Sequence, residues 1–178
     1  MTGRDVGRFV LVVLLFEVVQ QSIVLDLRLG SVHADVMVLF PILAGVIGGP
    51  SRGALFGFCA GLVADLFLPT PYGLSALVGS LVGFGTGTAT LALNRSAWWL
   101  PPLAGFGGSA VYELLYASLG SVLGQPQMLH VDLLRIVLVV SVTNAVLALP
   151  AMRLVAWAIP AASTEGMPTS AVSSGATR

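Results

Sequence analysis

The chain has 178 residues, of which 56% are hydrophobic and only 9% are charged, and its formal net charge at pH 7 is zero. Soluble domains carry about 25% charged residues, so a chain this poor in charge cannot cover its surface with hydrated groups. The composition therefore predicts an integral membrane protein, and the balanced charge gives no indication of a nucleic-acid partner.

Long apolar runs divide the chain into candidate membrane spans. A helix that crosses a bilayer needs about 17–25 mostly apolar residues. The runs predict an all-α integral membrane fold with six transmembrane helices in one domain, residues 1–159. The predicted spans are residues 6–25, 34–49, 52–68, 73–93, 98–119 and 131–153. Residues 160–178 are rich in Ser, Thr, Ala and Gly, which predicts a disordered cytoplasmic tail.

The arginines indicate how these spans are oriented. Loops on the cytoplasmic side of a membrane carry an excess of basic residues. If the N-terminus is cytoplasmic, most of the arginines fall on that side and only Arg28 lies in an external loop. The arginines on the predicted cytoplasmic side are Arg4, Arg8, Arg52, Arg95, Arg153 and Arg178. We therefore expect a multi-pass protein of the plasma membrane with both termini in the cytoplasm.

Small residues recur every four positions in the third and fourth predicted spans. In a soluble helix each interior glycine costs about 0.5–1 kcal/mol relative to alanine, whereas in lipid small residues let helix backbones approach closely. Four residues advance about 400° around a helix, so each series lies on one face. The two series are Gly53, Gly57 and Gly61, and Ser75, Gly79, Gly83 and Gly87. They predict helix packing within the chain or, alternatively, a groove for a partner's helix.

The glycine series extends backwards across Pro50. Gly45 and Gly49 continue the four-residue spacing, but they belong to the preceding predicted span. We interpret this extension as partly coincidental.

Charged and turn residues gather at the predicted outer side of the membrane. Carboxylates inside a membrane are costly and usually find partners. We define an outer-side polar cluster made of Asp35, Asp65, Pro71, Gly73, Glu113 and Arg135. We hypothesise that Arg135 pairs with Glu113 or Asp65. Two alternatives are a local pair with Asp132 and, for Asp35 and Asp65, simple contact with lipid headgroups.

Glu17 lies near the middle of the first predicted span. We expect it to face the protein interior or a partner helix, because a carboxylate in lipid is unfavourable. A proton relay is an alternative, but the other carboxylates gather at the outer side instead of forming a path through the membrane.

No motif for catalysis or metal binding is found. The Gly-x-Gly fragments lack the flanking strand of a phosphate-binding loop. His33 and His130 stand without a second ligand at metal-binding spacing, and no nucleophile is paired with a base. The sequence therefore predicts a non-enzymatic protein without catalytic residues, metal or cofactor.

Residues 35–87 resemble the central region of the rod shape-determining protein MreD family. That family shows an Asp at the start of the second span, a glycine-rich third span that ends in Asp, and a Pro-x-Gly turn. The matching elements are Asp35, Gly57, the run Gly61-Leu62-Val63-Ala64-Asp65, the turn Pro71-Tyr72-Gly73-Leu74, and Gly83. The chain departs from the family pattern at Ala34, where Pro is common, and at Phe84, where Tyr is frequent.

The resemblance implies a non-enzymatic scaffold of the bacterial cell-elongation machinery. Members of the family bind MreC and connect with MreB, RodA and a class B penicillin-binding protein to organise lateral peptidoglycan synthesis. The family is also similar to the six-helix substrate-binding subunits of energy-coupling-factor transporters. A vitamin-type transporter subunit is therefore the alternative function. Those subunits carry an Ala-x-x-x-Ala face on the first span, whereas residues 9–25 here contain no Ala.

Overall fold

A computed structural model of the protein describes residues 3–20, 35–93, 97–125 and 133–159. Within these ranges the regular elements are all helical, and no strand is found. In chain order they are α1 (Gly3–Val19), α2 (Leu39–Gly48), α3 (Pro50–Ala64), α4 (Leu74–Ala89), the short 3-10 helix η2 (Thr90–Ala92), α5 (Leu100–Val122) and α6 (Leu133–Ala158). The predicted all-α class is confirmed. The predictions for Arg28, Arg95, Asp132, His33, His130 and the tail at 160–178 lie outside the described residues.

Each predicted span overlaps one of the six α-helices of the described ranges, but the bounds and lengths differ from expectation. Among the described residues, α6 alone passes a test of length and apolar composition for a membrane span, with a mean hydropathy of 2.1 over its best window. The helix within predicted span 34–49 is α2, which has 10 residues. A helix of that length extends only about 15 Å, half of the hydrocarbon thickness of a bilayer. That all six helices cross a membrane stays a prediction.

Helix α2 forms the centre of the structure. Every residue from 39 to 46 is buried, which is expected for a helix that is apolar on all sides. The ring of Phe40 contacts α1 through Phe9 and Phe16, with ring centroids 5.5 and 6.0 Å apart. On the side of α5, the side chain of Ile42 packs against Gly108. The other helices therefore pack around a short apolar helix.

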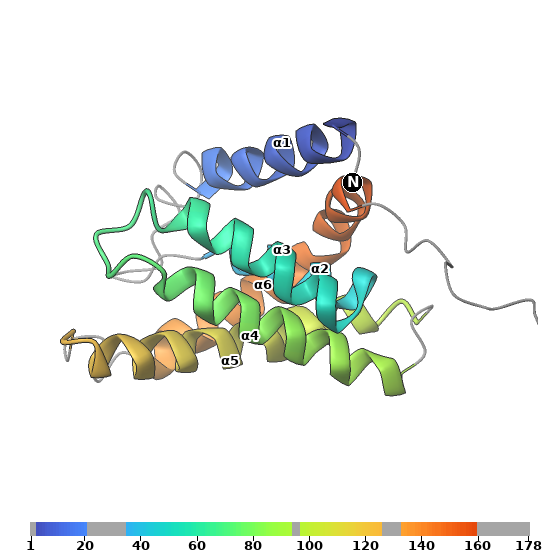
Figure 1. Ribbon diagram of the computed structural model, residues 1–178. Helices are drawn as coiled ribbons and strands as arrows, with labels where there is room; N and C mark the ends of the chain where they lie inside the picture. Colours follow the sequence, from blue (N-terminus) through green and yellow to red (C-terminus); the bar gives the residue numbers. More distant parts are fainter. Residues whose placement is uncertain (1–2, 21–34, 94–96, 126–132, 160–178) are drawn as a thin grey trace, which may run out of the picture.

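The helices run back and forth between two ends of the molecule (Figure 1). One end holds the start of α1, the turn between α2 and α3, and the end of α6; we name it the Gly49 end. There the Arg8 guanidinium lies 5.1 Å from the centroid of the Trp157 ring, which joins α1 to α6. The opposite end, which we name the Asp65 end, holds the turn between α3 and α4. Residues far apart in the chain thus meet at each end.

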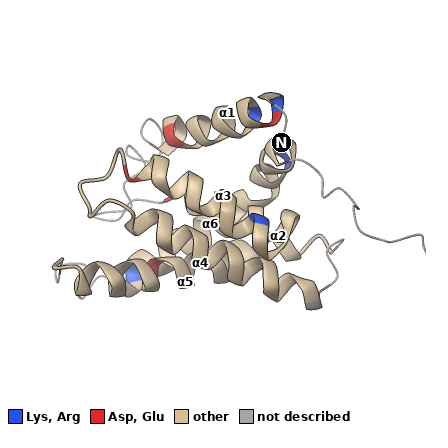
Figure 2. Cartoon of the chain, viewed as in Figure 1, with Lys and Arg blue, Asp and Glu red and all other residues tan. Residues whose placement is uncertain are grey.

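Charges separate between these two ends (Figure 2). Arg4 and Arg8 lie in the first half of α1, Arg52 is near the start of α3, and Arg153 is near the end of α6, so all four are toward the Gly49 end. The carboxylates Glu17, Asp35, Asp65 and Glu113 lie toward the Asp65 end. Among the described residues, Asp5 and Arg135 are the exceptions to this separation.

Large apolar side chains are exposed on every α-helix except α2. Val18 on α1 is 60% exposed and Val146 on α6 is 71% exposed. Exposed apolar residues are normal when they are scattered singly, but contiguous apolar surface marks contact with a membrane or a partner. The outer surface of this helical body is therefore suited to an apolar environment.

Candidate functional site

The glycine faces of α3 and α4 pack directly against each other. A Cβ atom built on Gly79 would lie 2.7 Å from the carbonyl oxygen of Gly57. A Cβ atom on Gly53 would overlap the Gly83 carbonyl oxygen, and the same holds in the other direction. A side chain on Gly61 would meet the backbone of Ser75 and Ala76. The predicted packing within the chain is confirmed, and these faces are not open to a partner's helix.

The backward extension of the glycine series is not a coincidence, and our interpretation of Gly45 was wrong. A Cβ atom on Gly45 would overlap the Gly83 carbonyl oxygen, and one on Gly53 would lie 2.7 Å from the Gly45 Cα. Gly49 has a φ of 79°, a conformation in which glycine is favoured, and Pro50 begins α3 directly after it. This tight turn folds α2 back onto α3, so that one junction joins three helices.

Asp65 closes the α3–α4 hairpin at the opposite end. Its carboxylate accepts hydrogen bonds from the backbone N–H groups of Gly73 at 2.8 Å, Ser75 at 3.0 Å and Ala76 at 3.4 Å. These donors surround the N-terminus of α4, where backbone N–H groups lack helical partners. Asp65 is 1% exposed, so it does not extend to lipid headgroups.

The turn residues of the predicted cluster serve the same hairpin. Gly73 precedes α4 with a φ of 91°, which favours glycine. The carbonyl oxygen of Pro71 accepts a hydrogen bond from Leu74 N at 3.2 Å. Asp65, Pro71 and Gly73 therefore form a structural cap for α4.

Three other carboxylate residues converge on a cavity of about 360 Å³ at the Asp65 end. Glu17 comes from α1, Asp35 from the segment before α2, and Glu113 from α5. The wall also contains the polar side chains of Gln20, Ser75, Tyr112 and Tyr116. We name this site the carboxylate cavity.

Hydrogen bonds fix the segment that carries Asp35. The Asp35 Oδ1 atom accepts a bond from Met37 N at 3.0 Å, and Gln20 Oε1 accepts one from Val36 N at 2.9 Å. Asn144 of α6 donates from Nδ2 to the Asp35 carbonyl oxygen and to Ser109 Oγ, both at 2.8 Å. The segment is therefore tied to the residue that follows α1 and to α6, and through Asn144 it is connected to α5.

Two tyrosines form an aromatic wall of the cavity. The rings of Tyr112 and Tyr116 are stacked, with centroids 6.0 Å apart and an interplanar angle of 12°. The Tyr116 hydroxyl donates to Thr70 Oγ1 at 2.9 Å, which holds its ring in place. The wall thus places two aromatic rings beside carboxylates.

The predicted outer-side polar cluster is divided by the structure. Asp35 and Glu113 share the cavity, and Glu17, which we had separated from them, joins it from α1. Arg135 is exposed in the first turn of α6, and within the described part of the chain no ion pair joins it to Glu113 or Asp65. The hypothesised pairing is therefore not formed, because Asp65 binds α4 and Glu113 faces the cavity.

Asn144 and Ser109 were missed by the sequence analysis. Both are fully buried, and they join α6 to α5 beneath Asp35. The lone Asn in the apolar sequence of α6 could have predicted this contact, since polar residues in apolar helices often form hydrogen bonds to neighbouring helices.

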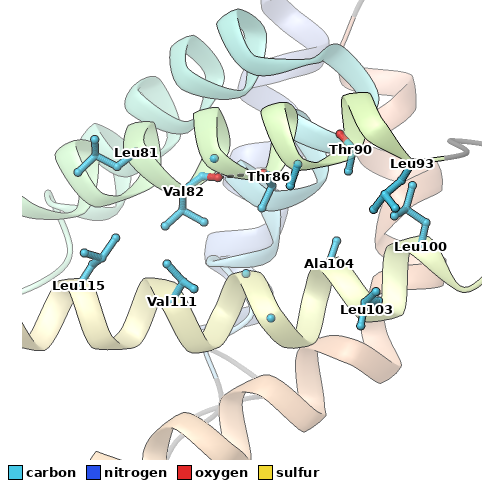
Figure 3. Close-up of a pocket in the computed structure, with 14 residues that line it drawn as sticks. Leu81, Val82, Thr86, Thr90, Leu93, Leu100, Leu103, Ala104, Val111 and Leu115 are labelled. Atoms are coloured by element: carbon cyan, nitrogen blue, oxygen red, sulfur yellow. Dashed lines mark hydrogen bonds between the residues drawn. The ribbon is translucent and has the colours of Figure 1, made fainter.

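An apolar groove of about 430 Å³ lies between α4 and α5 (Figure 3). Its walls include Leu81 and Val82 from α4 and Leu103 and Val111 from α5. No charged residue lines it, and the Thr90 hydroxyl of η2 donates to the Gly87 carbonyl oxygen at the end of α4, at 3.1 Å.

Glycines on both walls leave this groove open. Gly85 and Gly107 line it, and a Cβ atom built on either would find no atom within 4 Å. The groove therefore has room for additional apolar groups.

In comparisons with known proteins, no family model, no curated protein and no solved structure matches the chain. Among the described residues, no group of three or more His, Cys, Asp or Glu side chains is arranged to hold a metal ion. The two candidate sites for function are the carboxylate cavity and the apolar groove.

Proposed function

We propose that the protein is a non-enzymatic scaffold of the bacterial cell-elongation machinery that binds MreC in the plasma membrane. In this role it helps to maintain rod shape by organising lateral peptidoglycan synthesis with MreB, RodA and a class B penicillin-binding protein. The resemblance of residues 35–87 to the MreD family supports the proposal.

A membrane location is supported by the outward-facing apolar side chains on five helices and by the length of α6. We propose that all six helices lie in the bilayer, with both termini in the cytoplasm. Four arginines near the Gly49 end agree with this orientation, because basic residues favour the cytoplasmic side.

The observation that carries the scaffold proposal is the open groove between α4 and α5. The glycines of α3 and α4 are used inside the chain, so a partner's helix must bind elsewhere. The groove is uncharged and bounded by two long helices, and Gly85 and Gly107 leave it unfilled. Small residues allow such close helix contacts in membranes. We propose that the transmembrane helix of MreC binds there.

Coexpression with MreC followed by gentle purification tests the proposal. We expect the two proteins to purify in a fixed ratio. Gly107→Leu should fill the groove and reduce the MreC recovered at least fivefold. Gly7→Leu is the matched control, because Gly7 also faces open space but lies on α1, away from the groove. Failure of the unaltered protein to retain MreC would contradict the scaffold proposal, and equal recovery with both variants would contradict the groove as the binding site.

A second candidate function is that of the substrate-binding membrane subunit of a small-molecule transporter. The carboxylate cavity is the observation that favours it, because ligand sites are concave and contain a few convergent polar groups. The absence of Ala from residues 9–25 argues against coupling in the manner of vitamin transporters. Copurification of an ATPase module in place of MreC would favour transport.

A further inference from the structure

The carboxylate cavity has acidic side chains but no basic side chain in its described wall. Glu17, Asp35 and Glu113 line it, and its described wall contains no Arg, Lys or His. A carboxyl group in a site partly shielded from water favours its ionised form only beside a positive charge or hydrogen-bond donors. A positively charged occupant would supply such a charge.

Glu113 is the carboxylate best placed to meet such an occupant. Its side chain is partly buried and lines the cavity, and it makes no hydrogen bond to any residue within the described ranges. Asp35, by contrast, already accepts a bond from Met37 N. An occupant with N–H donors or positive charge would therefore contact Glu113 first.

The size and the aromatic wall of the cavity indicate an organic cation. A volume of about 360 Å³ falls within the range of about 300–1,000 Å³ that is usual for small-molecule pockets, and it is far larger than a bare ion needs. Tyr112 and Tyr116 present stacked rings beside the carboxylates. Aromatic faces attract ammonium and guanidinium groups through their quadrupoles.

We infer that the carboxylate cavity binds a small organic cation that carries an ammonium or guanidinium group. The charged group contacts Glu113 and Asp35, and its carbon atoms lie against Tyr112 and Tyr116. Because Glu17 belongs to α1 and Gln20 directly follows it, the ligand also connects α1 to α5 and to the segment before α2. This inference gives the ligand class for the second candidate function, and it does not depend on the binding of MreC.

The test uses the purified full chain and two matched pairs of probes. Choline is compared with its uncharged analogue 3,3-dimethylbutan-1-ol, and benzylammonium is compared with benzyl alcohol. We expect at least one cation to bind saturably by calorimetry and to raise the Tm, and its uncharged analogue to bind at least tenfold more weakly. Equal binding of both members of each pair, or no binding of either cation, would overturn the inference.

Variants locate the site. Glu113→Gln should weaken binding of the cation at least tenfold. Tyr116→Leu should weaken it about threefold to tenfold, whereas Tyr116→Phe, which keeps the ring, should retain it. If Glu113→Gln does not fold, the two Tyr116 variants still decide the result. If Tyr116→Leu binds the cation with unchanged affinity, and Glu113→Gln does so too where it folds, the cation binds outside this cavity. The same conclusion holds if sodium or magnesium chloride raises the Tm saturably and as much as the organic cation does.

The same preparations separate this inference from the scaffold proposal. If MreC is retained while neither cation binds, only the inference about the cavity fails. If a cation binds while MreC is not retained, only the scaffold proposal fails.

Discussion

Helix α4 has two opposite faces that carry small residues, and the two faces differ completely in what they contact. Ser75, Gly79, Gly83 and Gly87 meet the backbones of α3 and of the turn before it. Gly85 and Ala89, which are offset from that series by two residues, face the groove. Two residues correspond to about 200° around a helix, so the second series lies on the opposite side.

The difference arises from the neighbouring helix. Helix α3 meets α4 with glycines of its own, so the two backbones come into direct contact. Helix α5 instead presents the large side chains Leu103, Val111 and Leu115 around Gly107, which keep its backbone away from α4. Small residues on one helix therefore permit close packing, but only a matching face on the second helix produces it.

The largest expected effect comes from Gly57→Leu on the packed face. The new side chain would overlap the Gly79 carbonyl group, which belongs to a helix backbone and cannot turn aside. We expect a loss of at least about 3 kcal/mol in the free energy of unfolding, or no folded protein at all. Denaturant unfolding in detergent, followed by circular dichroism, measures the loss.

Gly85→Leu is the matched control for the open face. A Cβ atom there meets nothing within 4 Å, so we expect the free energy of unfolding to change by no more than about 0.5 kcal/mol. Equal losses in Gly57→Leu and Gly85→Leu would contradict the distinction between the two faces.

The next largest effect is expected at Asp65, which holds the packed face in register. Asp65→Ala leaves the N–H groups of Gly73, Ser75 and Ala76 without their acceptor in a buried site. The expected loss is about 2–3 kcal/mol in the free energy of unfolding. Asp65→Asn keeps one acceptor oxygen and should lose about half as much. If Asp65→Ala unfolds at the same denaturant concentration as the unaltered protein, the cap does not stabilise the hairpin.

The sequence was sufficient for the approximate positions of the helices and for the α3–α4 packing, because both depend on local periodic patterns. The positions of Gly53, Gly57 and Gly61 relative to Ser75, Gly79 and Gly83 follow from one short turn. The turn between α2 and α3 brings Gly45 into the same junction, and this could not be seen from spacing alone because Gly49 reverses the chain direction.

The carboxylate cavity was harder to predict because its residues come from separate parts of the chain. We placed Asp35 and Glu113 in one cluster by their expected depth in the membrane, and this grouping is confirmed. Depth alone also placed Asp65 in the predicted cluster, whereas its carboxylate accepts hydrogen bonds at the N-terminus of α4. Glu17 was placed apart because the first predicted span extended to residue 25, whereas α1 ends at Val19, which puts Glu17 near the helix end.

The smallest expected effect is that of Thr86→Val, at the boundary between the two faces of α4. Thr86 lines the groove, and its hydroxyl donates to the carbonyl oxygens of Val82 at 2.9 Å and of Ile42 at 3.3 Å. Bonds of this kind, to carbonyls that also serve the helices, contribute little net stability. Valine keeps nearly the same shape, so we expect a loss of about 0.5–1 kcal/mol in the free energy of unfolding.

Thr86→Ser separates the hydroxyl from the methyl group. If backbone contact holds the junction together, Thr86→Ser and Thr86→Val should each cost about 1 kcal/mol or less, because neither changes the fit of Gly45 against Gly83. A loss above about 2 kcal/mol in the free energy of unfolding of Thr86→Val, with no loss in Thr86→Ser, would contradict the view that backbone contact holds the junction together. The hydrogen bond to Ile42, more than the bare glycine backbones, would then hold α2 against α4, and the contrast between the packed and open faces would depend on one hydroxyl group.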